Sequence, residues 1–428
     1  MNLKHKGNIL IILILLITVA LFMLAKEPGD LITTNPLLLF SQFLAIIGTA
    51  LFSMSFVLSS RARSVEHLFD GLGNAYKVHH FIGTTGFLFL INHPALLVLK
   101  AFFNDSSTTL YLIPGDLRSY NYGIFAIYLL ILLIVLTLFI KLPYNIWKFT
   151  HTFMGAVLLF ALLHVLNIES DVSGNTLLGL WMKFLLIAGG AAFIYKQFLY
   201  KKVSGKYIYR VSGLSTEGEV VNLSLSPEEK SVNIRPGQYA FIKVLDNKNV
   251  TKEEHPFSIV EVNDAGEVIF SIKKLGDYTR TLGNLNKGDT VEIVGPFGAV
   301  YKKLNTDSDL VFIAGGIGVT PFVEAVERAL EAGKNVSLYY SVHEQPEALY
   351  NDRFKKLSEK HSAFNYKVWL SNTRGKISVA TIESDLKSLS HKFFLICGPK
   401  PMMDGLKSQL KSKGVKPGSI YTEDFDLR

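Results

Sequence analysis

The first half of the chain holds six apolar segments, each long enough to cross a membrane as a helix. Such a helix needs roughly 17 to 25 predominantly apolar residues. The segments cover residues 8–25, 37–58, 79–103, 122–140, 149–167 and 177–199. The first resembles a signal peptide, but it is long for one and ends without a clear cleavage site, so we interpret it as a retained helix. The sequence therefore predicts a six-helix transmembrane bundle in residues 1–202.

Basic residues lie at alternate ends of these segments. One set of ends holds Lys4, Lys6, Arg61, Arg63, Lys141, Lys148, Lys196, Lys201 and Lys202, and the opposite set holds Glu27, Asp30, Asp105, Asp116, Glu169 and Asp171. Because cytoplasmic loops carry the excess of Lys and Arg, a multi-pass plasma-membrane protein with both termini in the cytoplasm is predicted. The net charge of +8 serves this orientation. The expected partner is therefore the lipid membrane, and nucleic acid is not expected.

Histidines are the expected metal ligands, because Cys397 is the only cysteine and cannot form a thiolate cage. His79 and His93 are 14 residues apart on the third segment, and His151 and His164 are 13 apart on the fifth. At about 1.5 Å per residue, each pair spans roughly 20 Å of a hydrocarbon core about 30 Å thick. Both segments run in the same direction, so His79 should lie level with His151 and His93 with His164. Two such pairs can hold two stacked haems by axial ligation.

Several alternatives stay open for these histidines. They can instead be polar residues hydrogen-bonded inside the bundle, and His80 competes with His79 because it lies 13 residues from His93. Thirteen residues at about 100° each miss a common helix face by roughly 140°. Either the fifth helix is irregular, or its two rings approach their sites differently. Pro94 is expected to disturb the third helix near the outer site.

Residues 203–303 alternate strand-like runs with Gly, Pro and Asp turns, which predicts a small antiparallel β-barrel. A flavin needs a flat apolar slot with a hydroxyl near its redox nitrogen, and donors for its pyrophosphate. Phe257 and Ser258 fit the first need, and Gly276 with Thr279 fits the second. The expected FAD-binding residues are Arg235, Gln238, Tyr239, His255, Pro256, Phe257, Ser258, Lys273, Gly276 and Thr279.

Residues 304–428 alternate apolar strands with helices, which predicts a doubly wound α/β domain with a parallel sheet. Glycines after the first strand let a pyrophosphate approach the backbone at a helix start, where Thr320 is the expected N-cap. A second turn closes the same sheet edge, and Cys397 within it has an alternative role as a buried structural thiol. The expected nucleotide-binding residues are Gly315, Gly316, Gly318, Thr320, Pro321, Ser341, His343, Cys397, Gly398 and Pro399.

The order of these motifs resembles the NADPH oxidase and ferric reductase superfamily, most closely its short bacterial NADPH oxidases. Paired histidines are followed by R-P-G-Q, H-P-F-S, G-D-x-T, G-G-I-G-V-T-P and C-G-P across nearly the whole chain. The resemblance implies a ferredoxin-NADP reductase-like fold for the second half, with FAD in the barrel and NADPH in the last domain. It also implies two b-type haems, whose ligands by position are His79, His93, His151 and His164, and superoxide formed at the outer haem.

Two further positions bear on this resemblance. Phe425 resembles the family's carboxy-terminal aromatic residue that stacks on the flavin, and with Ser258 it is an expected catalytic residue. The chain continues three residues past Phe425. The animal oxidases carry a second histidine one helical turn beyond the outer haem ligand, where this chain has Leu97.

The sequence as a whole predicts an NAD(P)H oxidase that passes electrons through FAD and two haems to molecular oxygen on the outer face. Two alternatives stay open. One is a reductase of external ferric chelates, which short outer loops without a metal-binding cluster disfavour. The other is an electron-donor subunit for an extracytoplasmic protein, although no obligate protein partner is expected. Ser341 and His343 follow a strand without an arginine for a ribose 2′-phosphate, so NADH should be accepted as well as NADPH.

Overall fold

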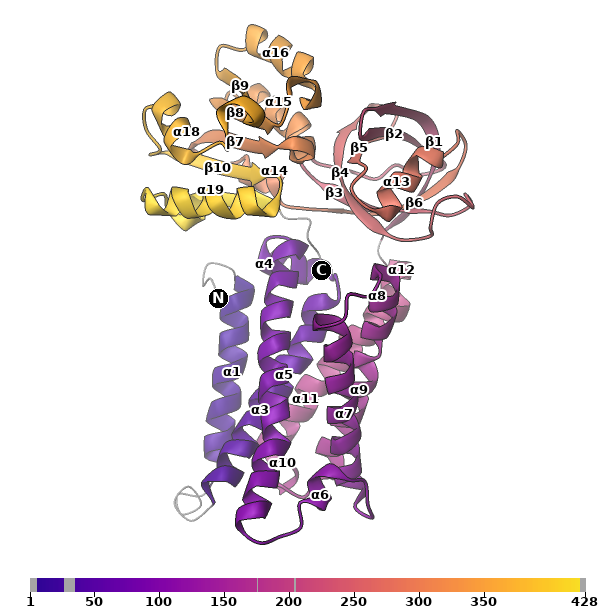
Figure 1. The fold of residues 1–428 in the computed structure, drawn as a ribbon, viewed down its shortest axis with the longest axis vertical. Coiled ribbons are helices and arrows are strands. Elements are labelled where there is room, and N and C mark those ends of the chain that lie inside the picture. Colours follow the sequence, from indigo (N-terminus) through magenta and orange to yellow (C-terminus); the bar gives the residue numbers. More distant parts are fainter. Residues whose placement is uncertain (1–5, 27–34, 175, 204, 424–428) are drawn as a thin grey trace. The chain divides into compact units, whose positions relative to one another are not determined.

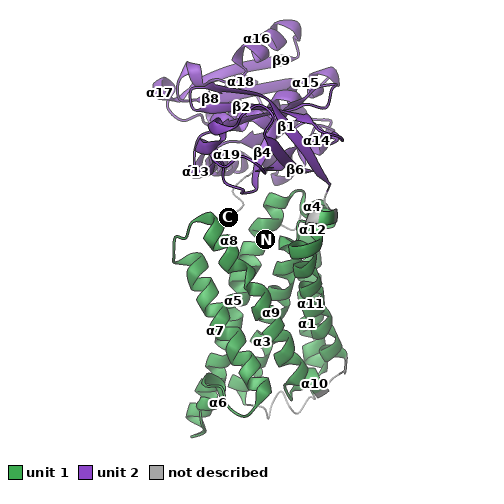
Figure 2. Cartoon of the chain, turned by 90° about the vertical axis from the view of Figure 1, so that its right-hand side faces the viewer, with its two compact units in different colours: residues 1–203 green, residues 204–428 purple. Residues whose placement is uncertain are grey.

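The computed structural model of the protein describes residues 6–26, 35–174, 176–203 and 205–423. The chain divides into two compact units, Met1–Val203 and Ser204–Arg428 (Figure 2). The first unit is a helical bundle. The second contains a closed β-barrel followed by a five-stranded parallel sheet (Figure 1).

Six helical spans in the described part of unit 1 are long and apolar enough to cross a membrane, as the sequence predicts. They are α1 (Lys6–Leu24), α3 (Pro36–Ser59), α5 (Leu72–Phe103), α7 (Arg118–Leu138), the pair α8 (Tyr144–Thr152) with α9 (Met154–Asn167), and α11 (Thr176–Ile194), which a π-helix (Tyr195–Leu199) extends. Short helices mark the ends of the bundle. At one end lie α6 (Thr109–Leu112) and α10 (Asp171–Gly174), and at the other α4 (Arg63–Phe69) and α12 (Tyr200–Val203) (Figures 1 and 2). We call these the α6 end and the α4 end.

The fifth span is interrupted at Phe153, which separates α8 from α9. The hydroxyls of Thr150 and Thr152 donate to the carbonyls three residues earlier, at 2.9 and 2.6 Å. Such bonds compete with the regular helical pattern and bend helices. The Phe153 N–H accordingly bonds the Thr150 carbonyl, one residue short of the α-helical pattern. The structure thus confirms the irregular-helix alternative for the segment that carries His151 and His164.

Helices α3 and α5 pack through glycines. A Cβ atom added at Gly48 would lie 2.9 Å from Leu90 Cγ, and one added at Gly86 would lie 3.2 Å from Leu51 Cβ and 3.4 Å from the Gly48 carbonyl oxygen. Small residues allow helix backbones in membranes to approach closely. The α5 helix continues through Pro94 to Phe103, so the expected disturbance does not end it.

The barrel of unit 2 has the strand order β1-β2-β5-β4-β3-β6, and β1 pairs with β6 to close it. The strands are β1 (Lys206–Glu217), β2 (Val220–Pro227), β3 (Tyr239–Val244), β4 (His255–Val262), β5 (Val268–Lys273) and β6 (Thr290–Phe297). The short helix α13 (Asp277–Thr281) and a 3₁₀ turn, η2 (Leu282–Asn284), follow β5. All neighbouring strands are antiparallel, which confirms the predicted barrel.

The parallel sheet has the strand order β11-β10-β7-β8-β9. Its strands are β7 (Asp309–Gly315), β8 (Val336–Val342), β9 (Phe364–Leu370), β10 (Lys392–Cys397) and β11 (Ile420–Glu423). The helices around it are α14 (Val300–Lys303), α15 (Val323–Glu331), α16 (Asn351–Lys360), α17 (Ser371–Arg374), α18 (Val379–Leu386) and α19 (Lys400–Ser412), with 3₁₀ turns η3 (Gly316–Phe322), η4 (Gln345–Glu347) and η5 (Pro417–Ser419).

Alternate residues of β7 pack into two separate cores. Leu310 and Phe312 join the core that contains α15, whereas Val311 and Ile313 join the core that contains α18 and α19. A strand with both faces covered by helices is typical of a doubly wound sheet. After β9 the chain returns to the other side of β7 to form β10. Ligands bind at such a reversal, beyond the carboxyl ends of the strands.

Charged side chains join the barrel to the sheet domain. Arg353 of α16 contacts Glu327 of α15 through Nε at 2.6 Å and Glu261 of β4 through Nη1 at 2.5 Å. The Tyr350 hydroxyl lies 2.5 Å from the Ser271 hydroxyl of β5. A planar guanidinium that holds two carboxylates restricts how the two parts of unit 2 can move.

The glycine contact between α3 and α5 leads to a prediction about stability. Gly86→Leu is expected to lower the melting temperature of the purified full-length chain in detergent, because the new side chain would separate the two helices. Overpacking of this kind costs about 1 to 3 kcal/mol. Gly83→Leu is the matched control, since nothing lies within 4 Å of a Cβ atom at Gly83 on the same helix. Equal melting temperatures for the two variants would contradict the packing described here.

Candidate functional site

Two pairs of histidines come together inside the bundle. His79 of α5 and His151 of α8 have ring centres 6.3 Å apart, with the ring planes at 80°. His93 of α5 and His164 of α9 line one cavity of about 410 Å³. Each histidine thus meets the partner that helix length and direction predict. The interruption at Phe153 lies between His151 and His164. In a regular helix, their separation of 13 residues would have pointed one of the two rings away from α5.

The histidines on α5 and α9 share one pattern of hydrogen bonds. In each, Nδ1 lies at hydrogen-bond distance from a backbone carbonyl oxygen, which therefore accepts the Nδ1 proton. The pairs are His79 with Ser55 at 2.9 Å, His93 with Ser41 at 3.1 Å, and His164 with Ser119 at 2.7 Å. A proton fixed on Nδ1 leaves the lone pair of Nε2 for a metal. The Ser41 hydroxyl also lies 2.8 Å from His93 Nδ1, and because it donates to the His93 carbonyl at 2.8 Å it can accept the same proton. These oxygens together favour the tautomer that an axial ligand needs.

His151 is held differently. Its Nδ1 lies 3.4 Å from the Thr137 hydroxyl, which itself donates to the Leu133 carbonyl at 2.7 Å. The indole of Trp147, one helical turn earlier, stacks on the imidazole at 5.4 Å with an angle of 26° between the rings. The weak hydrogen bond and the stacked ring together orient His151 towards His79.

Of the two α3 serines, only Ser41 contacts its histidine through its side chain as well, and Ser55 contacts His79 through its backbone carbonyl alone. Ser41 and Ser55 are 14 residues apart, the same separation as His93 and His79. Because α3 and α5 are consecutive spans that run in opposite directions, each serine lies level with one histidine. Ser119 has no such signal, since it acts through a backbone carbonyl, which any residue type can supply. Thr137 acts through its hydroxyl, and no matching spacing marks it in the sequence.

The cavity between His93 and His164 has room for a flat group. Gly123 of α7 faces His164, and a Cβ atom there would lie 3.1 Å from the imidazole. Apolar side chains from all six spans line the cavity, among them Phe22, Phe52, Leu90, Leu130, Val157 and Met182. Ligand pockets are usually apolar with a few placed polar groups, and this cavity is of that kind.

The paired imidazoles fit a b-type haem. A metal–imidazole bond is about 2 Å long, so two axial rings on opposite sides of one iron would have centres roughly 6 Å apart. The rings of His79 and His151 lie at 6.3 Å. Among the residues that the structure describes, no group of three or more His, Cys, Asp or Glu side chains lies together. An imidazole pair matches the donor set that a haem takes, because the porphyrin supplies the remaining four nitrogens.

His80 lies beside this site. It is exposed on α5, and its ring centre is 5.8 Å from that of His79. His79 is half-buried, contacts His151 directly and has its Nδ1 bonded to Ser55. The geometry therefore favours His79 over His80 as the ligand.

In the barrel, the two motifs expected to bind FAD lie on paired strands. Tyr239 of β3 is opposite Ser258 of β4, and Ala240 is opposite Phe257. Ser258 is buried and Phe257 is half-buried. Tyr239 is buried and packs against Phe297, with ring centres 5.8 Å apart.

Contacts of Arg235 and Gln238 hold the backbone that leads into β3. The Arg235 N–H donates to Gln238 Oε1 at 2.8 Å, and Gln238 is buried. The Arg235 guanidinium lies over the Tyr301 ring, 5.0 Å from its centre. Pro256 and Lys273, at the start of β4 and the end of β5, are both half-exposed.

Beside this strand pair lies a stack of aromatic rings that was not predicted from the sequence. The Tyr278 ring of α13 stacks on His255 at 4.0 Å and lies nearly parallel to Phe257 at 6.4 Å. His255 Nε2 lies 2.8 Å from Glu253 Oε2. The Tyr278 hydroxyl is buried and has no hydrogen-bond partner among the described residues. A buried hydroxyl without a partner fits a site where a bound polar group completes the hydrogen bonding.

Thr279 shapes the turn before α13. Its hydroxyl accepts hydrogen bonds from the N–H groups of Leu275 at 3.0 Å and Gly276 at 2.9 Å. These two N–H groups are therefore already engaged, and Thr279 positions the backbone of the turn.

In the sheet domain, the two expected nucleotide-binding turns meet at the carboxyl ends of β7 and β10. A Cβ atom at Gly318 would lie 2.6 Å from the backbone carbonyl of Cys397, and one at Gly398 would lie 3.0 Å from the Gly315 Cα. Only glycine permits this approach of two backbones. Gly316 has φ = 52° and open space beside it, as a turn that admits a pyrophosphate requires. Pro399 is exposed beside them.

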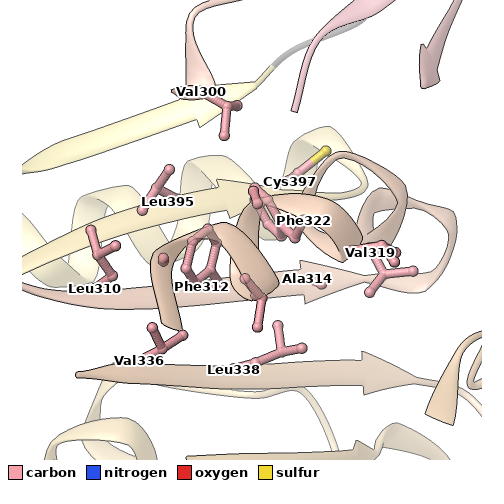
Figure 3. Close-up of a cluster of buried hydrophobic side chains, with 14 of the residues drawn as sticks. Val300, Leu310, Phe312, Ala314, Val319, Phe322, Val336, Leu338, Leu395 and Cys397 are labelled. Atoms are coloured by element: carbon pink, nitrogen blue, oxygen red, sulfur yellow. The ribbon is translucent and has the colours of Figure 1, made fainter. Parts of the chain in front are cut away.

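Cys397 is buried at the end of β10, in the same hydrophobic cluster as Phe322 (Figure 3). Phe322 packs on Phe312 of β7, with ring centres 5.0 Å apart. The thiol thus belongs to the core that supports both turns, as the structural alternative for this residue expects.

The predicted N-cap role of Thr320 is wrong. Gly316 to Phe322 form the 3₁₀ helix η3, and α15 begins only at Val323. The Thr320 hydroxyl donates to the Ile317 carbonyl at 2.9 Å, and Thr320 and Pro321 are both buried. Tight packing of the glycine turn against Cys397 favours the narrower 3₁₀ geometry over an immediate α-helix.

Ser341 and His343 lie at the carboxyl end of β8, where Ser341 is opposite Gly315. His343 is exposed, and its carbonyl accepts a hydrogen bond from the N–H of Asn372 in α17 at 3.3 Å. Arg374 of the same helix packs its guanidinium over the Trp369 ring, 5.4 Å from the ring centre. Phe425, the expected flavin-stacking residue, lies outside the described residues.

Three family models match the chain in succession. A "ferric reductase like transmembrane component" matches residues 44–162, an "FAD-binding domain" residues 204–307, and an "oxidoreductase NAD-binding domain" residues 312–408. They cover the bundle, the barrel and the parallel sheet in that order.

Curated relatives match less than half of the chain. A flavohemoprotein of Candida albicans is 31% identical over 187 residues, 40% of this chain and 46% of the relative. The toluate 1,2-dioxygenase electron transfer component of Pseudomonas putida is 27% identical over 217 residues, 47% of this chain and 63% of the relative. The chain thus covers less than two thirds of the length of either relative.

A solved structure supports the fold. The flavohemoglobin of Malassezia yamatoensis, with bound FAD and heme, aligns with 91% of this chain and 96% of its own, at a TM-score of 0.50 and 17% identity.

The ligand geometry leads to a prediction about haem content. His79→Leu is expected to lose one of two haems per chain, because the Nε2 that faces His151 is removed. His80→Leu should keep both, since His80 is exposed. The measurement is the pyridine haemochrome spectrum of each purified variant. Loss of a haem in His80→Leu and its retention in His79→Leu would reverse the assignment.

The nucleotide site leads to a second prediction. Discrimination between NADPH and NADH should be weak, because His343 is exposed and the nearby Arg374 is stacked on Trp369. Steady-state kinetics should give kcat/KM values for the two nucleotides that differ by less than about a thousandfold, or about 4 kcal/mol. A larger preference for NADPH would mean that a guanidinium binds the 2′-phosphate.

Proposed function

We propose that this chain, which has the domain architecture of the NADPH oxidases and ferric reductases, is a superoxide-producing NAD(P)H oxidase. A ferric reductase-like transmembrane component followed by FAD-binding and NAD-binding domains is the architecture of these flavocytochromes b. On this proposal the chain oxidises NAD(P)H in the cytoplasm and reduces molecular oxygen on the outer face of the plasma membrane.

The observation that carries the proposal is the arrangement of the four histidines. His79 with His151, and His93 with His164, form two imidazole pairs at two depths of an apolar bundle. Ionisable side chains inside a membrane bundle are costly and mark functional sites, and two pairs of imidazoles match the ligands of two haems. The backbone carbonyls of Ser55, Ser41 and Ser119 hold these rings in place. Bound FAD and b-type haems supply the redox chemistry at these sites.

The stoichiometry follows from the electron count. One NAD(P)H gives up a hydride, which carries two electrons and a proton. Two oxygen molecules each gain one electron, so the products are one NAD(P)⁺, one proton and two superoxide ions. The protein's own contribution is to bind, to orient and to exclude water along the path.

In unit 2, the chain's residues have separate tasks on this proposal. Phe257 and Tyr278 form the flat aromatic wall for the flavin, and Ser258 places a hydroxyl beside it. The glycine turn at Gly316 receives the nucleotide pyrophosphate. Phe425 is proposed to cover the flavin until the nicotinamide arrives.

The basic residues decide the orientation of the bundle on this proposal. The α4 end carries Arg61, Arg63 and Lys196, and the α6 end carries acidic residues such as Glu169 and Asp171. The positive-inside rule favours the α4 end in the cytoplasm. The cavity between His93 and His164 then extends towards the outer side of the membrane, where we propose that oxygen is reduced.

Molecular oxygen fits the outer site better than an acceptor that would need a binding site of its own. His93 and His164 would hold the outer haem through their two imidazoles, and a haem held in this way would pass electrons to oxygen without binding it. Such a site needs only a small apolar passage. We therefore propose oxygen as the main acceptor, with slower reduction of soluble ferric chelates and with no obligate protein partner.

Superoxide formation is tested with the purified chain and NADPH in air. Cytochrome c should be reduced, and superoxide dismutase should suppress most of that signal, because superoxide carries the electrons. His164→Leu is the matched control, which should lose the activity while NADPH still reduces the flavin. A signal that dismutase leaves unchanged, with ferric chelate reduced much faster than oxygen is consumed, would favour the ferric-reductase alternative.

A further inference from the structure

The cavity between His93 and His164 is polar towards the α6 end. Lys100, Tyr111 and Tyr120 line it there, from α5, α6 and α7 respectively. The rings of Tyr111 and Tyr120 are 5.9 Å apart and tilted by 56°. Three side chains with hydrogen-bond donors thus line one part of an otherwise largely apolar space.

These three donors are not engaged within the described part of the chain. The structure gives Lys100 Nζ and the hydroxyls of Tyr111 and Tyr120 no hydrogen bond and no ion pair there. Other polar groups nearby are satisfied. Lys26 Nζ lies 2.5 Å from Asp171 Oδ2, and the Tyr128 hydroxyl donates to a backbone carbonyl at 2.6 Å. A half-buried ammonium and two phenols that line one cavity and have no partners among the described residues fit an occupant that carries an anionic group.

The acidic side chains of the cavity do not fill this role. Asp171 and Glu169 also line it, but Asp171 pairs with Lys26 and Glu169 is exposed. Lys100 forms an ion pair with neither of them in the structure described here. The partner of Lys100 is therefore expected to come with the occupant of the cavity.

Helix geometry relates Lys100 to the iron ligand. Lys100 follows His93 by seven residues, so it lies on nearly the same face of α5, about 10 Å farther along the helix axis. A b-type haem has an apolar macrocycle with two propionate carboxylates on one edge. A ring held at His93 with that edge towards the α6 end would bring its carboxylates to the lysine and the two phenols.

We propose that Lys100, Tyr111 and Tyr120 bind the propionates of the haem held by His93 and His164, and so determine which edge of it faces the α6 end. This inference rests on the proposed function, since it needs a haem in that cavity. A charge-assisted contact with Lys100 and two phenol hydrogen bonds would anchor the group independently of its axial ligands.

The state of Tyr111 is consistent with this role. Burial, and after it the neighbouring Tyr120, raises the pKa of Tyr111 above its ordinary value. The hydroxyl therefore remains protonated at neutral pH and is available as a donor to a carboxylate.

The test uses the full-length chain in detergent and three measurements that do not depend on turnover. These are the haem content, the rate of haem transfer to apomyoglobin, and the midpoint potential of each haem by spectroelectrochemical titration. Lys100→Met is expected to lose the outer haem roughly tenfold faster than wild type, since a charge-assisted hydrogen bond is removed. Its midpoint potential should fall, because an unpaired propionate stabilises the more positively charged oxidised iron.

Two variants control for other effects. Lys100→Arg keeps the positive charge, so its rate of haem loss and its midpoint potential should be close to those of the wild type. Lys183→Met removes a lysine from the apolar helix α11. Lys183 does not line the cavity, so this variant should change neither the rate of haem loss nor the midpoint potential. If Lys100→Met fails to fold, the double variant Tyr111→Phe with Tyr120→Phe, which keeps both rings, should show the faster haem loss.

Three results would overturn the inference. Wild-type haem loss and potential in Lys100→Met, with only the KM for the acceptor changed, would mean that Lys100 attracts the acceptor. Lys100→Arg behaving like Lys100→Met would exclude a role of the charge. A wild-type chain with the same haem content as His93→Leu would overturn the haem site itself, and the propionate assignment with it. The first two results leave the proposed function intact.

Discussion

An imidazole inside an apolar helical bundle must satisfy both of its ring nitrogens, and the rest of this structure follows from that need. A buried nitrogen without a partner costs a large part of the free energy that packing provides. Here the proton of Nδ1 is shared with carbonyls of α3 and α7, and each carbonyl has a second lone pair for this purpose. Nε2 is then left facing the partner histidine or the cavity. For His79, His93 and His164 the backbone thus favours one tautomer before any cofactor binds, whereas His151 relies on the Thr137 hydroxyl and the Trp147 ring.

This requirement determines how the helices pack. Helix α3 must lie close enough to α5 for its carbonyls to reach two imidazole rings, and Gly48 and Gly86 permit that approach. Helix α7 must present both a carbonyl and room for a ring, and Gly123 provides the room opposite His164. In the fifth span, the threonines before Phe153 disturb the helix enough to direct both histidines inward. Each local irregularity thus serves the orientation of a ring.

Much of the architecture could be predicted from the sequence because it depends on periodicity and length. The six apolar spans, the barrel and the parallel sheet are all confirmed. What could not be predicted depends on contacts between distant segments. The Tyr278 ring meets His255 only after the barrel has closed. Thr320 was expected to cap a helix, but the approach of Gly318 to Cys397 favours a 3₁₀ turn there, and no local sequence rule contains that contact.

The matched spacing on α3 and α5 limits how this bundle can change during evolution. Ser41 and Ser55 are as far apart as His79 and His93. The distance between the two histidine sites is therefore set by segments of equal length on α3 and α5. Deleting one residue between His79 and His93 would rotate one ring by about 100° relative to the other and shift it by about 1.5 Å. No compensating deletion in α3 alone would undo the rotation. Substitutions can accumulate along these two helices, but insertions and deletions between the two sites should be almost absent among functional descendants of this sequence.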